Sequence, residues 1–305
     1  MKRSTAVRLI LILTLLLPAG APVWAQQAPP PAVGAASGGQ GPKDPPVQNG
    51  GPASALGLGD PTASGSGGPI EIDADEGIEW LRDQNVYIAR GNAQARRGDM
   101  SITADTLMAH YRADATGKTK IHMVEADGHV VLVSKDSKIV GDKMTYDLEK
   151  GAAIITGQDL RATSKEQYVT ANESLEYWSN QGAVVARGDA VAHNPQQEIH
   201  ADLLTGYFRD DQPKGGKKLY QVEASGNVRI LSKGNIARAS KAVYNLDNEV
   251  ATLEGGVKIT RDKNQLNGER AVYNLKTGQA KITGGGKRVK TLLVPGSDSG
   301  GILKP

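Results

Sequence analysis

Residues 124–148, VEADGHVVLVSKDSKIVGDKMTYDL, contain the two patterns that determine the expected fold. In the first pattern, apolar or small residues occupy every second position from Val124 to Leu132, with Gly128 in the middle. The second pattern has the same alternation but shifts by one residue at Asp142. Because successive side chains of a strand point to opposite faces, both patterns predict β-strands. The one-residue shift predicts a β-bulge at the acidic residue.

The two patterns alternate along most of the chain, from Ile70 to about Val294. Apolar residues at helical spacing do not persist beyond one turn there, so we expect an all-β fold with at most a short helix. Strong copies of the first pattern centre on Gly91, Gly128, Gly188, Gly226 and Gly255, and weaker copies on Gly157 and Gly284. The second pattern has its polar residue at Asp105, Asp142, Asp202, Ser240 and Glu269.

The patterned region is also an internal duplication of about 97 residues. A shift of 97 places Ala89-Arg90-Gly91 on Ala186-Arg187-Gly188, and a shift of 98 places 120–135 on 218–233 with eight of sixteen residues identical. Links as short as 149–151 can join only antiparallel neighbours. We therefore expect about 14–16 consecutive antiparallel strands that bend at the central glycines into two facing sheets.

The inner faces of these two sheets are predicted to form an apolar lining. An ordinary packed core is the alternative, and the scarcity of Phe and Trp favours a lining that leaves room. The predicted lining consists of Val130, Leu132, Ile139, Met144, Tyr146, Ile155, Val169, Leu175, Tyr177, Val228, Ile230, Tyr244, Leu253, Val257 and Ile259.

The segments outside the patterned region have different compositions. Residues 1–25 combine three cations, an apolar run from Leu9 to Leu17 and a small-residue site ending at Ala25, so they predict a cleaved signal peptide rather than a membrane anchor. Residues 26–69 are rich in Pro and Gly and predict a disordered linker, with a polyproline ligand at 29–31 as a less favoured interpretation. Residues 295–305 are expected to be a flexible tail.

Composition and motifs argue against several kinds of chemistry. The chain has no Cys, which excludes disulfides and thiolate sites, and its net charge of +3 equals the three cations of the first eight residues. A neutral body argues against nucleic acid as a partner. The repeated acids lack the spacing of a calcium loop, and we expect no catalytic residues, metal or cofactor. The histidines do not recur in the duplication and are expected on strand surfaces: His110, His122, His129, His193 and His200.

The strand types Gly141-Asp142-Lys143-Met144-Thr145-Tyr146 and Gly226-Asn227-Val228, in tandem on a cysteine-free chain with an export signal, resemble those of the LptA/OstA-like periplasmic lipopolysaccharide-transport proteins. The resemblance covers 70–294. It implies an open β-jellyroll whose trough shields lipid A acyl chains between the inner and outer membranes, with LptC-like and LptD-like transport components as partners. The Pro/Gly-rich linker is not part of that family pattern.

The two ends of the sheet should be free edge strands, and the resemblance implies that they join head to tail. The predicted assembly residues are Ile70, Ile72, Val289, Leu292 and Val294. The cations at Lys287, Arg288 and Lys290 could instead protect the edge. Two other functions were weighed: a structural or adhesive exported repeat protein with a solid core, and a glycan-acting β-solenoid enzyme, which the short links disfavour.

Overall fold

The computed structural model describes residues 71–97, 100–113, 119–134, 137–210, 217–232, 234–277 and 279–294. The expected signal peptide, the linker, the C-terminal tail and Ile70 lie outside the described residues. Within the described part, no helix is long and apolar enough to cross a membrane.

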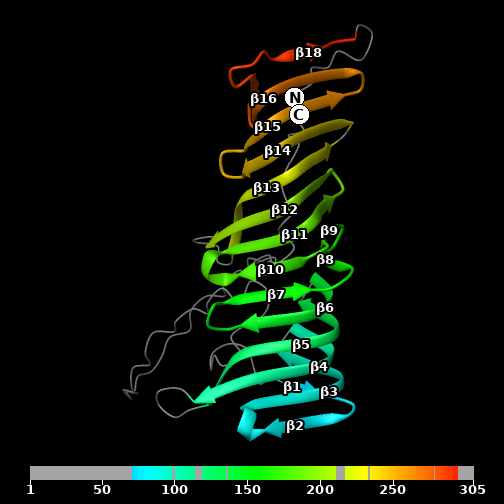
Figure 1. Cartoon of the computed structure of the whole chain (residues 1–305), viewed down its shortest axis with the longest axis vertical. Coiled ribbons are helices and arrows are strands. Elements are labelled where there is room, and N and C mark those ends of the chain that lie inside the picture. The colour runs from blue at the N-terminus through cyan, green and yellow to red at the C-terminus, as the bar shows by residue number, and fades with distance from the viewer. Residues whose placement is uncertain are drawn as a thin grey trace, which may run out of the picture.

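Eighteen strands of the described residues form one continuous antiparallel sheet (Figure 1). Short 3-10 turns at Arg82–Gln84 and Ser179–Gln181 separate strands in the two copies of the duplication. The strands are β1 (Glu71–Asp73), β2 (Gly77–Leu81), β3 (Val86–Arg97), β4 (Met100–Ala113), β5 (Thr119–Ser134), β6 (Ser137–Asp147), β7 (Ala152–Thr156), β8 (Leu160–Ser164), β9 (Gln167–Ala171), β10 (Ser174–Trp178), β11 (Ala183–Asn194), β12 (Gln197–Asp210), β13 (Lys217–Ser232), β14 (Asn235–Asn245), β15 (Val250–Arg261), β16 (Asn264–Asn274), β17 (Gln279–Thr283) and β18 (Lys290–Leu292).

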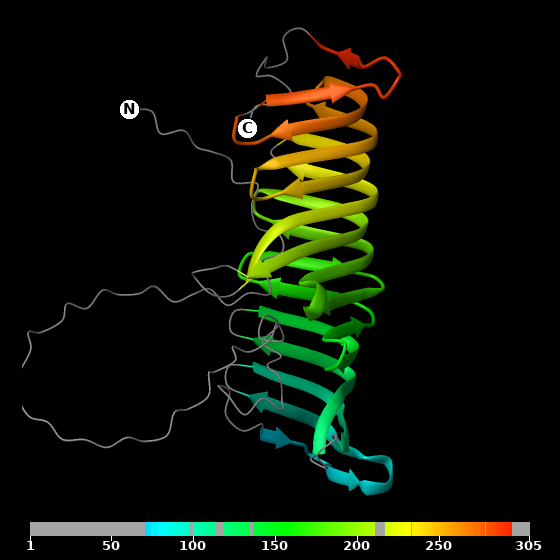
Figure 2. The same ribbon diagram turned by 90° about the vertical axis from the view of Figure 1, so that its left-hand side faces the viewer.

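Several short strands are two halves of one bent strand. In each case the two short strands pair with different parts of the same neighbouring strand. The short strands and their shared neighbour are β1 and β2 on β3, β7 and β8 on β6, β9 and β10 on β11, and β17 and β18 on β16. Counted this way, the chain has fourteen bent strands, each beside its predecessor, as the two sequence patterns predict. Figure 2 shows the result: strands bend along one long side, and the sheet becomes a tall trough with two walls.

The bends occur at the central glycines because the backbone there is left-handed at two successive residues. In β5 these are Gly128 (φ 81°) and His129 (φ 49°), and they stand opposite the single residue Asp142 of β6. The structure therefore has a bulge at the level of Asp142, but its extra residue is on the glycine strand and not on the strand with the acid, where the sequence pattern had placed it. A Cβ on Gly128 would lie 2.0 Å from the carboxylate of Asp105 in β4, so only glycine fits.

The contact between a bend glycine and a polar residue recurs along the whole trough. The acid of each second-pattern strand lies against the glycine of the following first-pattern strand, and Ser240 takes this place once. The pairs are Glu76–Gly91, Asp105–Gly128, Asp142–Gly157, Glu173–Gly188, Asp202–Gly226, Ser240–Gly255 and Glu269–Gly285. The acids and glycines that stood out separately in the sequence are thus one structural device, which forms the bend.

The interior between the two walls is mostly apolar, with a few buried polar side chains such as Gln197. One cluster of buried residues extends from β3 to β13, and a smaller cluster around Val257 lies in β14–β16. Ile230 and Ala242 pack against both clusters and connect them. The duplication therefore shares one interior, which positions the candidate site.

Candidate functional site

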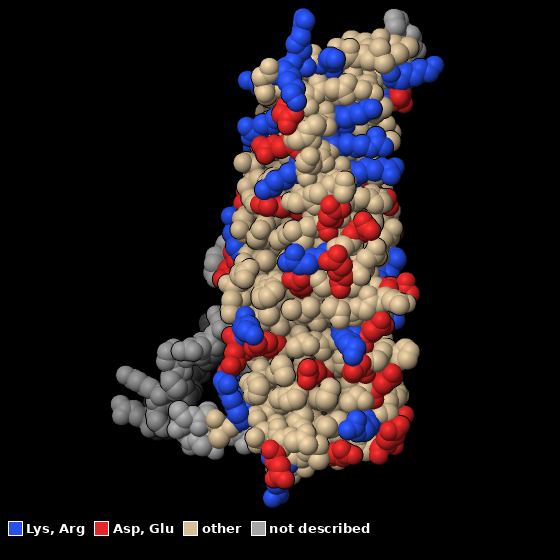
Figure 3. Space-filling model, in the orientation of Figure 1, with Lys and Arg blue, Asp and Glu red and all other residues tan. Residues whose placement is uncertain are grey.

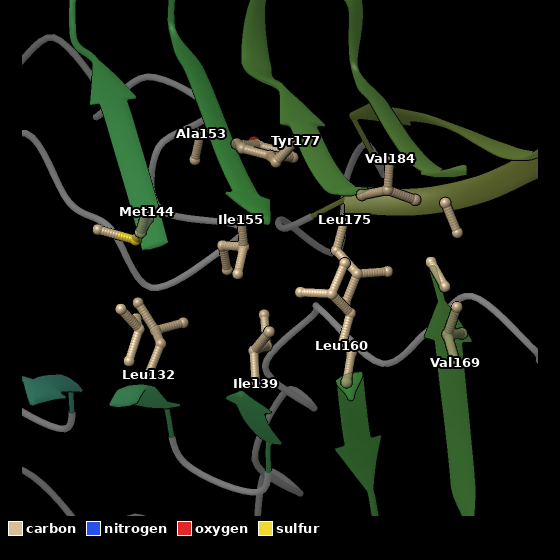
Figure 4. Packing of buried hydrophobic residues seen from close by; sticks show 14 of the residues in the cluster. Leu132, Ile139, Met144, Ala153, Ile155, Leu160, Val169, Leu175, Tyr177 and Val184 are labelled. Atoms are coloured by element: carbon tan, nitrogen blue, oxygen red, sulfur yellow. The ribbon is translucent and has the colours of Figure 1, made fainter. Parts of the chain in front are cut away.

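The two walls of the trough meet through side chains in the N-terminal part. Figure 4 shows Leu132, Ile139 and Leu160 of one wall pointing toward Met144, Ile155 and Leu175 of the other. All six are buried, and Leu160 is only 1% exposed. In this part of the molecule the predicted lining fills the interior with its own side chains.

The C-terminal part has an apolar cavity of about 60 Å³ between the same two walls. Three of the predicted lining residues, Ile230, Tyr244 and Leu253, line this cavity. Its other lining residues are Gln197, Ile199, Leu219, Val222, Ala224, Ala242, Val243, Leu246, Ala251 and Thr252. By the usual measure the cavity has room for about four water-sized groups.

The second copy has smaller side chains than the first at three interior positions, and one of them, Ala242, lines the cavity. Strand register places Ala242 where the first copy has Met144, since each lies opposite an alanine, Ala224 or Ala126. Register likewise matches Leu160 with Val257 and Leu175 with Ala271, which are buried nearby in the smaller cluster. The replacement of methionine by Ala242 removes side-chain volume at the cavity wall.

The polar groups near the cavity are few and are held away from water. Gln197 lines the cavity, is 8% exposed, and its Oε1 has no hydrogen-bond partner among the described residues. Burial raises the pKa of Tyr244 to about 12, and burial also raises the pKa of Tyr273 and of Tyr177. Of these three tyrosines only Tyr244 lines the cavity, and its hydroxyl adds no charge to the lining at physiological pH.

Among the remaining predicted lining residues, Val130, Tyr146, Val169 and Tyr177 are buried in the large cluster, as is Val228. Val257 and Ile259 belong to the smaller cluster. Several of the cavity residues were not predicted as lining residues, among them Gln197, Leu219, Val222 and Ala242. A residue-by-residue comparison of the two copies gives a signal for one of them, since Ala242 replaces Met144 of the first copy.

Within the described residues, β1 and β2 pair only with β3, and β17 and β18 pair only with β16, so the sheet has an open edge at each end there. At the N-terminal end Ile72 is 42% exposed, and Trp80 stacks on Tyr87 and donates a hydrogen bond to the Tyr111 hydroxyl over 2.7 Å. At the C-terminal end Leu292 is 58% exposed and Val289 is 43% exposed. The backbone N–H of Val294 donates to the Asn264 side chain, which holds the end of the chain against β16.

The described histidines lie on strand surfaces. Carboxylates pair with four of them, since Glu125 contacts His110, Asp105 contacts His129, and Glu198 contacts both His193 and His200. In the part of the chain with assigned structure, no group of three or more His, Asp or Glu side chains is arranged to hold a metal ion. The histidines therefore act here as partners of surface acids.

The fold and the interior define a class of protein: an open β-jellyroll, duplicated, with an apolar interior and a cavity between its walls. The family model for the LptA/(LptD N-terminal domain) LPS transport protein matches residues 71–174 and again residues 168–279. The chain belongs to this family of lipopolysaccharide transport proteins and contains two successive matches to it. The two matches correspond to the two copies recognised in the sequence.

One solved structure that is similar is the crystal structure of LptH, the LptA homologous periplasmic component of the conserved lipopolysaccharide transport device from Pseudomonas aeruginosa. The two chains share 20% identity, and the match covers 42% of this chain and 94% of that chain with a TM-score of 0.35. No curated protein matches this chain.

Proposed function

We propose that this protein is a periplasmic bridge that binds lipopolysaccharide and shields its acyl chains in the trough on the way from the inner to the outer membrane. The observation that carries the proposal is the apolar cavity between the walls in a member of the lipopolysaccharide transport family. No sequence motif or described cluster offers catalytic machinery, so binding is the function that the interior supports.

The energetics of acyl burial favour this assignment. Each methylene moved from water into an apolar interior gains about 0.8 kcal/mol, so a chain of about twelve carbons gains about 10 kcal/mol. The cavity admits about four such groups without any movement of the walls, which accounts for about 3 kcal/mol. A complete chain requires the walls to move apart, and the second copy, with its smaller side chains, offers less resistance to this opening than the first.

The charges at the two ends support head-to-tail self-association. Residues 71–79 hold five acids and no base, while 279–294 hold four bases and no acid. In Figure 3 basic side chains predominate over the uppermost strands, whereas acidic and basic side chains are mixed over the lower ones. Each end also has an open strand edge, so backbone pairing and charge complementarity would act together and lengthen the trough. LptC-like and LptD-like components of the two membranes would use the same kind of edge.

Depletion of the protein in its own cells tests the proposal. Newly made lipopolysaccharide should then fail to reach the cell surface and should accumulate at the inner membrane, and restoring the protein should restore delivery. Unchanged surface delivery after complete depletion would rule out the transport role.

A structural protein with a solid core is the second candidate, and one observation favours it: the N-terminal copy is packed. This alternative predicts that the protein binds no acyl chain in either copy while remaining folded. Binding measurements on the folded chain therefore separate the two functions.

A further inference from the structure

The unpaired buried polar atoms of the described residues are all in the C-terminal copy. They are Gln197 Oε1, Asn235 Oδ1 and the Tyr273 hydroxyl. A buried acceptor without a donor is costly, and native structures keep such groups where a ligand or water completes them. Two of the three are amide oxygens, which accept hydrogen bonds and cannot donate them.

One of these atoms lies in the cavity wall, and the other two belong to residues on strands that border the cavity. Gln197 lines it directly, and Ser232 lies between Gln197 and Asn235 in the strand register of β12, β13 and β14. Cross-strand neighbours share a face, so Asn235 is on the inner face, about 10 Å from Gln197 at the spacing of two strands. Tyr273 stands opposite Ala251, which also lines the cavity.

The packed copy lacks the amides. At the position equivalent to Gln197, 97 residues earlier, the chain has Met100, and at the position equivalent to Asn235, 98 residues earlier, it has Ser137. The two amides therefore occur in the copy that contains the cavity described above and not at the equivalent positions of the other copy. This coincidence indicates that they serve whatever enters the cavity rather than the fold, which forms without them in the first copy.

We propose that the C-terminal cavity selects acyl chains that carry a hydroxyl group near their polar end, and that Gln197 accepts a hydrogen bond from this hydroxyl. The proposal rests on the proposed function, because it requires acyl chains to enter the trough. The methyl end would lie among Leu219, Ile230 and Leu253, with the hydroxyl at the Gln197 end of the wall. Asn235 is placed to accept from a second donor nearby. Phosphate and carboxylate oxygens are acceptors and do not satisfy these atoms.

Competition between two fatty acids tests the selectivity on the full chain. 3-Hydroxylaurate and laurate have the same length and the same carboxylate, so a difference in their displacement of a fluorescent fatty acid reports the hydroxyl alone. One buried hydrogen bond predicts that 3-hydroxylaurate binds about fivefold to tenfold more tightly. Gln197→Met introduces the residue of the first copy and should bring the ratio to about one, while Met100→Gln in the packed copy should leave it unchanged.

The possible outcomes separate the selectivity from the proposed function. Equal binding of both acids to the natural protein, or a preference that survives in Gln197→Met, overturns the selectivity and leaves acyl binding in place. Failure of both acids to bind overturns both. A thermal melt of Gln197→Met serves as the folding check, and its Tm should not fall, because the substitution removes an unpaired buried amide.

Discussion

Filling the cavity with the side chain of the first copy should stabilise the protein and block acyl binding. Ala242→Met introduces the residue that occupies the equivalent position as Met144, which is buried there. At about 24 cal/mol per Å³ of cavity removed, filling 60 Å³ gains about 1.4 kcal/mol of unfolding free energy. For a domain of this size that corresponds to a rise in Tm of about 3–6 °C.

The same substitution removes the room for about four methylene groups. At about 0.8 kcal/mol each this costs about 3 kcal/mol, so laurate affinity should fall about a hundredfold. Scanning calorimetry measures the Tm, and displacement of a fluorescent fatty acid measures the affinity. Ala280→Met is the matched control, because Ala280 is exposed on β17 and the same side chain there should change neither quantity.

Two results would refute this reasoning. A lowered Tm would mean that the space between the walls in the second copy cannot accept the methionine and that the equivalence of the two copies is wrong. An unchanged laurate affinity in a stabilised variant would mean that the acyl chain binds elsewhere on the protein.

Three further predictions concern the bends and the edges. Gly128→Ala should lower the free energy of unfolding in urea by about 3 kcal/mol, because the new Cβ meets Asp105 and the backbone has a φ of 81°. Gly234→Ala is the control: its φ is similar but the space around it is open, so it should lower the free energy of unfolding by about 1 kcal/mol. Equal losses would contradict the role of the contact at the bend. Hydrogen bonding to Asp105 raises the pKa of His129 in the folded protein. The stabilisation from this pair should therefore be complete below the ordinary histidine pKa and should be lost as the pH rises through the higher folded pKa. His129→Asn should flatten this part of the dependence of Tm on pH, and an unaltered dependence would argue against the pair. Self-association, measured by sedimentation velocity, should weaken when the NaCl concentration is raised from about 0.02 to about 0.5 M. It should also weaken in the Lys290→Glu variant. Association that does not depend on salt would exclude charge pairing between the ends.

Much of the fold could be predicted from the sequence because strand alternation and the duplication repeat many times. The phase shift at Asp142 gave the level of the bulge in the sheet but the wrong strand, because the extra residue belongs to the neighbouring glycine strand. The partner of each acid could not be predicted, because the contact of Asp105 with Gly128 depends on strand register and on left-handed backbone at the glycine. The alternation of residues predicts which face of the sheet a side chain is on, but it does not predict which residue of the neighbouring strand that side chain contacts at the bend.

The candidate site was harder to predict for a related reason. Alternation places Leu132 and Ile230 on the same inner lining, and both do face the interior. Whether that interior is packed or hollow depends on the summed volume of side chains from several strands, as at Met144 and Ala242. Gln197 gave no signal at all, because a single amide in an alternating strand resembles a surface residue until its neighbours are known.

The most direct measurement uses two full-length proteins that differ only in the position of a photo-crosslinking amino acid. One carries it at Ile230, in the copy with the cavity, and the other at Leu132, the equivalent position in the other copy. Both are exposed to labelled lipopolysaccharide. We expect lipopolysaccharide adducts at position 230 and few or none at position 132. Absence of adducts at position 230 in a folded protein, or equal adducts at both positions, would contradict the claim that the C-terminal half of the trough receives the acyl chains.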